Sequence, residues 1–116
     1  MGNAEELALV EKALKSGLGG CVEWEPKEAE RVRRELEHFD VLPEGIQQQV
    51  VQYVRQGGKV RQVKETRPNR AHREYYYKVI LPMPTIFKKG LFVELELHDA
   101  DPEYPEVILV NAHEQS

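Results

Sequence analysis

Two adjacent glycines, Gly57 and Gly58, divide this chain into halves with different hydrophobic periods. Before them, apolar residues recur every three or four positions, which is typical of helices with one buried face. After them, apolar and polar residues alternate over short segments, which is typical of β-strands. Helices followed by a run of strands predict an α+β fold, with the N-terminal helices packed on one face of a four-stranded, mainly antiparallel sheet.

Three helices are predicted in the first half. Residues 3–16 form the first helix, and the glycines at the end of residues 1–20 predict a flexible link, so this segment is interpreted as a helical arm. The other two helices lie within residues 22–57 and begin at proline-containing steps that suit a first helical turn. A short stretch before them, Val22–Glu25, can be extended.

Four strands are predicted within residues 59–113. They combine β-branched or aromatic residues with turn signals at their ends, and they span residues 59–66, 72–81, 91–97 and 107–112. The sequence Pro82-Met83-Pro84 is expected to end the second strand, because proline has no N–H group for a sheet ladder.

Size and composition predict one domain spanning residues 1–116, with 41% apolar and 31% charged residues. No apolar run reaches the roughly 18 residues of a membrane span, and the acidic N-terminus has no apolar signal-peptide core. The single cysteine, Cys21, excludes an internal disulfide and a zinc site built on cysteines. These features predict a cytoplasmic protein without a membrane partner.

Positive charge is concentrated between Arg55 and Lys89. This stretch holds ten basic residues and only two acidic ones, a net charge of +8 in a chain of −4, so the remainder carries −12. Such asymmetry predicts a polyanionic partner, and aromatic residues among the cations favour RNA, because rings stack on bases while cations hold phosphates. The predicted RNA-binding residues are Lys59, Arg61, Lys64, Arg70, Arg73, Tyr76 and Lys78.

The order and size of the elements resemble the small ribonuclease-toxin fold group, which takes in RelE- and ParE-like toxins and the nuclease domains of colicins D and E5. The resemblance covers about residues 26–113 and rests on the basic segment 59–68, the tyrosines at 75–77 and the closing segment 108–113. It implies a metal-independent endoribonuclease that needs no organic cofactor. It also implies a neutralising protein partner of acidic character, like an antitoxin.

Cleavage of RNA without a metal needs a base for the 2′-hydroxyl, an acid for the leaving oxygen and cations for the phosphorane. Glu65, Arg67 and His72 lie in the basic stretch, and His113 follows the last strand; these four are the catalytic candidates. A pairing of His72 with His113 is possible, because the end of one antiparallel strand can lie beside the start of another. Glu65 has a simpler alternative role as a salt-bridge partner of Arg67 or Arg73.

Other interpretations stay open at this point. The acidic residues Glu94, Glu96, Asp99 and Asp101 suit a divalent cation, but the glutamates alternate as a solvated strand face and the aspartates fit a turn, so no metal site is predicted. The alternative functions are a non-catalytic module that binds nucleic acid or protein, and self-association through the opposite charges of the chain.

Overall fold

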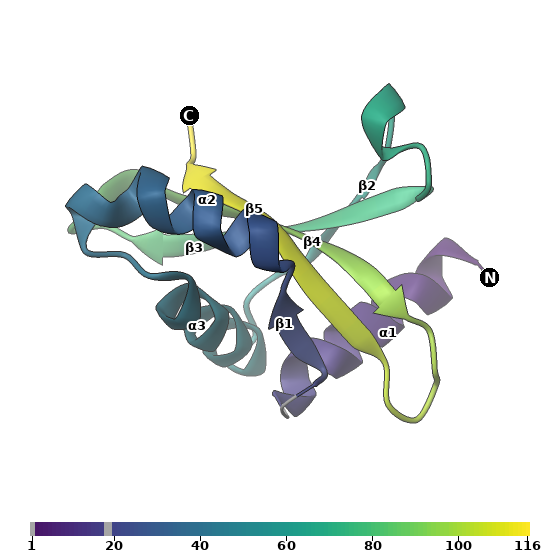
Figure 1. Cartoon of the computed structure of the whole chain (residues 1–116). Coiled ribbons are helices and arrows are strands. Elements are labelled where there is room, and N and C mark those ends of the chain that lie inside the picture. The colour runs from purple at the N-terminus through teal and green to yellow at the C-terminus, as the bar shows by residue number, and fades with distance from the viewer. Residues whose placement is uncertain (1, 18–19) are drawn as a thin grey trace.

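The structure, a computed structural model, describes residues 2–17 and 20–116 and has an α+β fold (Figure 1). Its elements are α1 (Asn3–Ser16), β1 (Val22–Trp24), α2 (Pro26–Leu36), the 3₁₀ turn η1 (Glu37–Phe39), α3 (Pro43–Arg55), β2 (Arg61–Lys64), the 3₁₀ turn η2 (Pro68–Arg70), β3 (Tyr75–Met83), β4 (Phe87–Asp99) and β5 (Glu106–Glu114). Across these described ranges, no helix has the length and apolar character needed to cross a membrane.

Five strands form one sheet in the order β1-β5-β4-β3-β2. Strands β2 to β5 are antiparallel neighbours, whereas β1 pairs in parallel with β5, with Val22 beside Val107 and Trp24 beside Leu109. The predicted α+β class is confirmed, but the sheet is mixed and has five strands, where four were expected. The fifth strand, β1, has three residues, which are too few to show a strand period, and it pairs with β5 near the other end of the chain.

Alternation along the strands gives the sheet a core face and a polar face. The core face carries large side chains that are almost fully buried: Tyr77, Val79, Leu81, Leu91, Val93, Leu95 and Leu109. Helices α1 and α3 contribute Val10, Leu14, Ile46 and Val50 to the same cluster. Most of the hydrophobic stabilisation of the fold therefore lies between these helices and one side of the sheet.

Helix α1 is docked on this core, not held as a loose arm. Val10, Ala13 and Leu14 are fully buried, and the Arg55 guanidinium of α3 donates to the carbonyl of Lys15 at 2.8 Å. In Figure 1, α1 passes behind β4 and β5. Of the predicted glycine-rich link, Leu18 and Gly19 lie outside the described residues, whereas Gly17 ends α1 in the left-handed conformation at φ 60°.

Helix α2 runs beside β5, beyond the point where β1 ends (Figure 1). It begins at Pro26, and the Glu25 carboxylate caps it by accepting from the Glu28 N–H at 2.9 Å. Val32 and Leu36 are buried in the core, while the polar side of the helix reaches the other face of the sheet. The expectation that the helices share one face thus holds for α1 and α3, whereas α2 lies at an edge.

Strand β3 differs from its predicted span at both ends. It begins at Tyr75, because residues 68–73 are taken up by η2 and the turn that follows, and it continues through Pro82 to Met83. Strand β2 pairs only with Tyr75–Lys78, so the outer edge of Pro82 has no strand neighbour among the described residues. Proline is tolerated there because no ladder N–H is needed, and the predicted break at this position was therefore wrong.

Candidate functional site

Five charged side chains from the β2–β3 hairpin and β4 meet on the polar face of the sheet. We call Glu65, Arg67, Arg73, Glu94 and Glu96 the charge cluster. Arg73 contacts all three carboxylates, with its Nη2 at 2.8 Å from Glu65 Oε1. Arg67 places Nε 2.9 Å from Glu65 Oε2 and Nη2 2.9 Å from Glu94 Oε2.

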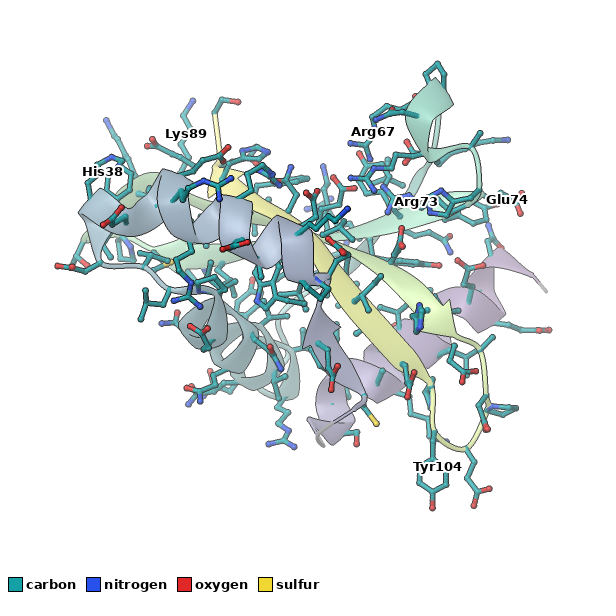
Figure 2. All side chains as sticks on the ribbon, viewed as in Figure 1. His38, Arg67, Arg73, Glu74, Lys89 and Tyr104 are labelled. Carbon is teal, nitrogen blue, oxygen red and sulfur yellow. The ribbon has the colours of Figure 1, made fainter. Side chains whose placement is uncertain are left out.

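The hairpin explains how these groups meet. Glu65 follows β2, and its N–H donates to the carbonyl of Glu74 at 2.8 Å, which closes the two sides of the turn. Arg67 and Arg73 therefore emerge from opposite sides of the same turn, and Figure 2 shows them converging while Glu74 points away. Since Lys78 of β3 lies opposite Glu94 of β4, the carboxylates of β4 point to this same face.

Burial divides the cluster into a hidden part and an accessible part. The side chains of Glu65, Glu94 and Arg73 are 2%, 3% and 7% exposed, whereas that of Arg67 is 42% exposed. Every buried side-chain nitrogen and oxygen of the described residues has a hydrogen-bond partner. Arg67 is thus the cationic member that an external ligand can reach.

The guanidinium groups keep the buried carboxylates ionised. Hydrogen bonds from Arg67 lower the pKa of Glu65 to about 2, against the opposing effect of burial and with further help from Arg73. Burial disfavours the charged form of Glu94, yet the hydrogen bonds from Arg67 and Arg73 hold its pKa below the ordinary value. The pKa of Arg67 is raised by its hydrogen bonds to Glu65 and Glu94. The two most buried carboxylates of the cluster, Glu65 and Glu94, are therefore negatively charged at neutral pH.

His72 extends the cluster into solvent. Its side chain is 59% exposed, and its Nε2 lies 3.3 Å from Glu96 Oε2, which also contacts Arg73. If Nε2 donates its proton to Glu96, the lone pair of the neutral ring is on Nδ1. Glu96 thus orients an accessible imidazole whose second nitrogen can take a proton.

Tyr76 is partly buried, and its ring lies next to the two guanidinium groups. Its ring centroid is 4.8 Å from the Arg67 Cζ and 5.2 Å from the Arg73 Cζ, which are cation–π distances. The assignment of Tyr76 to the face opposite the core is confirmed, because the next residue, Tyr77, is fully buried on the core face. Its ring therefore contacts both guanidinium groups, and a base that stacked on the side of the ring they occupy would have to displace one of them.

The predicted RNA-binding cations separate onto different surfaces. Arg61 pairs with Lys78 on β3, and Lys78 lies opposite Glu94, so both belong to the polar face. Lys64 is one step out of phase with Glu65 and therefore points to the other side of the sheet. Lys59 precedes β2 as an exposed side chain.

Arg70 belongs to a second contact between the hairpin tip and α2. Its Nη2 lies 3.3 Å from Glu28 Oε2, and Arg31 of the same helix donates to Asn111 Oδ1 of β5 at 2.9 Å. These contacts connect α2 to both the hairpin and β5 along the polar face. Arg70 is therefore a bridging residue in this structure, with its charge already opposed by a carboxylate.

His113 lies on the polar face but away from His72. Its ring stacks on Phe92 with centroids 4.6 Å apart, and the two residues are register partners. Phe92 is four residues from Glu96 along β4, a distance of about 13 Å at the usual strand rise. The structure brings Glu65, Arg67 and His72 into one connected group and does not bring His113 to it.

Sequence reasoning treated Glu94 and Glu96 as a solvated strand face, and for Glu94 this was wrong. Glu94 is 2% exposed and is the buried centre of the cluster. The alternation of the two glutamates was visible in the sequence, but their arginine partners come from the β2–β3 turn, about twenty residues or more earlier in the chain. Among the described residues no group of three or more His, Cys, Asp or Glu side chains is arranged to hold a metal ion.

Comparison of the chain with family models, with curated proteins and with solved structures found no match in any of the three. The site is a hydrogen-bonded carboxylate–guanidinium cluster with one accessible arginine, Arg67, and one accessible histidine, His72.

Proposed function

We propose that the charge cluster and His72 form a site for metal-independent cleavage of RNA. The observation that carries the proposal is the accessible His72 ring, oriented by Glu96 at 3.3 Å and connected through Arg73 and the shared Glu94 carboxylate to the accessible Arg67. An oriented imidazole and a fixed, accessible cation in one connected group supply the two elements that this chemistry needs most, a proton acceptor and a positive charge.

The proposed reaction begins at the 2′-hydroxyl of RNA. Nδ1 of His72 takes the hydroxyl proton while the 2′-oxygen forms a bond to phosphorus. The bond from phosphorus to the 5′-oxygen then breaks, and the leaving oxygen takes a proton from water. The products are a 2′,3′-cyclic phosphate and a free 5′-hydroxyl, and no electron donor or acceptor is required.

Arg67 is the proposed phosphate ligand. Four of its five N–H groups are used by Glu65 and Glu94, through Nε, Nη2 and one hydrogen of Nη1. The remaining Nη1 hydrogen belongs to a side chain that is 42% exposed. Because the neighbouring arms of the guanidinium are fixed by carboxylates, this donor has a defined direction before substrate arrives.

Attraction of the RNA backbone is assigned to Arg61 and Lys78. The cluster itself has one more carboxylate than guanidinium, which opposes an anionic substrate. Neither Arg61 nor Lys78 has a carboxylate within salt-bridge distance among the described residues, and both share the polar face with the cluster. Their charge therefore remains available for phosphates next to the cleaved one.

A non-catalytic RNA-binding module is the second candidate. Both arginines donate most of their N–H groups to carboxylates of the cluster, and this favours the binding module, because a network of this kind can have the purely structural role of holding the hairpin in place. In that case Arg61 and Lys78 bind RNA on a rigid surface, and His72 contributes nothing to chemistry.

Incubation of the protein with RNA in EDTA separates the two candidates. The wild-type protein is expected to produce fragments ending in 2′,3′-cyclic phosphate, and DNA of the same sequence should stay intact because it lacks the 2′-hydroxyl. His72→Ala and Glu96→Gln should each abolish cleavage while RNA binding is retained. His38→Ala is the matched control, because His38 is exposed at the opposite end of the molecule (Figure 2).

Intact RNA after incubation with folded wild-type protein that binds RNA would leave the binding module as the function. Cleavage that persists in His72→Ala would also overturn the proposed site. The fold of each variant is checked by its thermal unfolding, since Glu96 also contacts Arg73.

A further inference from the structure

We propose that the outer edge of β2 is a docking site for an extended acidic segment of a partner protein, which pairs with β2 as an additional antiparallel strand. This inference does not depend on cleavage of RNA by the charge cluster. It rests on the backbone of β2 and on the cations that flank it.

The outer edge of β2 offers backbone groups for pairing. β2 is the last strand of the sheet, and in the described part of the chain β3 is its one strand neighbour. The bond from the Glu65 N–H to the Glu74 carbonyl fixes the phase of the ladder. Bonded pairs alternate with non-bonded pairs in an antiparallel ladder, so Val63 and Arg61 face β3, whereas the N–H and C=O groups of Gln62 and Lys64 point outward.

The charge around this edge selects the partner. Lys59, Arg61 and Lys64 are exposed, and none of them forms an ion pair within residues 2–17 and 20–116. Basic side chains on an edge strand oppose pairing between two copies of the same strand, because like charges would meet. The same charges attract a strand that carries carboxylates, so we commit to an acidic segment and not to a second copy of this chain.

The spacing of the cations defines a pattern in the partner. Arg61 and Lys64 are three residues apart on β2 and therefore project from opposite faces of the sheet. A strand added alongside places two residues opposite them that are also three apart. The partner should therefore carry two acidic residues separated by two others, with an apolar or β-branched residue opposite Val63.

Binding of a defined peptide tests the proposal. The probe is acetyl-Ser-Thr-Glu-Val-Thr-Glu-Thr-Ser-amide, which places its glutamates opposite Lys64 and Arg61 in the antiparallel register. Hydrogen exchange of the full chain is followed by NMR with and without the peptide. The Gln62 and Lys64 amides should become protected on binding, whereas the Val63 amide, already bonded to β3, should change little.

Two controls separate backbone pairing from simple charge attraction. The same peptide with both glutamates replaced by lysine should bind at least roughly tenfold more weakly, and Arg61→Glu/Lys64→Glu should reverse this preference. N-methyl groups on the third and fifth peptide residues remove the donors opposite Lys64 and Gln62 and should abolish protection without changing the fold of the protein.

Several results would overturn the proposal. Equal binding of the acidic and basic peptides would remove the role of charge, and unchanged exchange at Gln62 and Lys64 at saturating peptide would remove the strand pairing. Protection that rises with protein concentration alone would assign the edge to a second copy. Protection of the same two amides by an RNA oligonucleotide, in place of the peptide, would assign these cations to nucleic acid.

Discussion

Arg73 Nη2 lies 2.8 Å from Glu65 Oε1, and neither side chain is more than 7% exposed. The pair joins the two sides of the β2–β3 turn, and Arg73 connects it to Glu94 and Glu96 on the next strand. The Arg73 guanidinium thus contacts three carboxylates and connects the β2–β3 turn to β4 on the polar face. The hairpin therefore depends on charged contacts where the other side of the sheet depends on apolar packing.

Replacing this arginine should destabilise the protein strongly. Arg73→Met removes one of the two cations that contact the three carboxylates of the cluster, two of which are buried. The free energy of unfolding is expected to fall by about 3–5 kcal/mol, because buried carboxylates lose a hydrogen-bonded partner. Urea unfolding followed by circular dichroism measures it. Arg61→Met, which removes an exposed cation from the same face, should change stability by about 0.5 kcal/mol or less. Equal effects of the two changes would contradict a structural role for the buried network.

The pKa of Glu65 predicts a loss of stability in acid. Hydrogen bonds from Arg67 hold this pKa at about 2, below its ordinary value of 4.5. A depressed folded-state pKa stabilises the protein above the unfolded-state pKa, and this contribution disappears as the pH falls from about 4.5 towards 2. The free energy of unfolding measured between pH 6 and pH 2 should fall less steeply for Glu65→Gln than for wild type. Glu103→Gln, in the exposed loop before β5 and without an ion pair among the described residues, is the matched control.

Gly90 and Gly45 should respond oppositely to alanine. Gly90 has φ +90°, and a Cβ there would lie 2.7 Å from the Leu81 carbonyl oxygen across the ladder. Gly90→Ala should therefore cost more than about 1 kcal/mol. Gly45 lies in α3 with nothing within 4 Å of such a Cβ, so Gly45→Ala should stabilise by about 0.5–1 kcal/mol. Thermal unfolding of both variants tests the pair, and a destabilised Gly45→Ala would show that the start of α3 is not an ordinary helix.

The salt dependence of RNA binding should identify the cationic face. Loss of two phosphate contacts in Arg61→Ala/Lys78→Ala should reduce the slope of log K against log salt by about 1.4 for single-stranded RNA. Lys64→Ala/Lys59→Ala removes the same charge from the opposite face and from the segment before β2. Fluorescence anisotropy at several salt concentrations compares them. The same slope change in both variants would mean that net charge, and not this face, attracts RNA.

The candidate site was only partly visible in the sequence. Glu65, Arg67 and His72 were marked by their place in a basic segment next to a turn, and a salt bridge from Glu65 to Arg67 or Arg73 was among the interpretations. The structure contains both of these salt bridges. The prediction that Glu94 is solvated is wrong, because alternation gives the face of a strand but not what covers that face. Its cover is Arg67 and Arg73, which a neighbouring turn supplies.

The types of the elements follow from the amino-acid sequence alone, because helical and strand periods depend on which residues share a face over a few positions. The change at Gly57 and Gly58, the helices on either side of β1 and the four antiparallel strands all follow from such local spacing. Tertiary structure decided the parallel pairing of β1 with β5, the docking of α1 and the burial of Glu94. Each of these depends on contacts between segments far apart in the chain, whose energies no local period records.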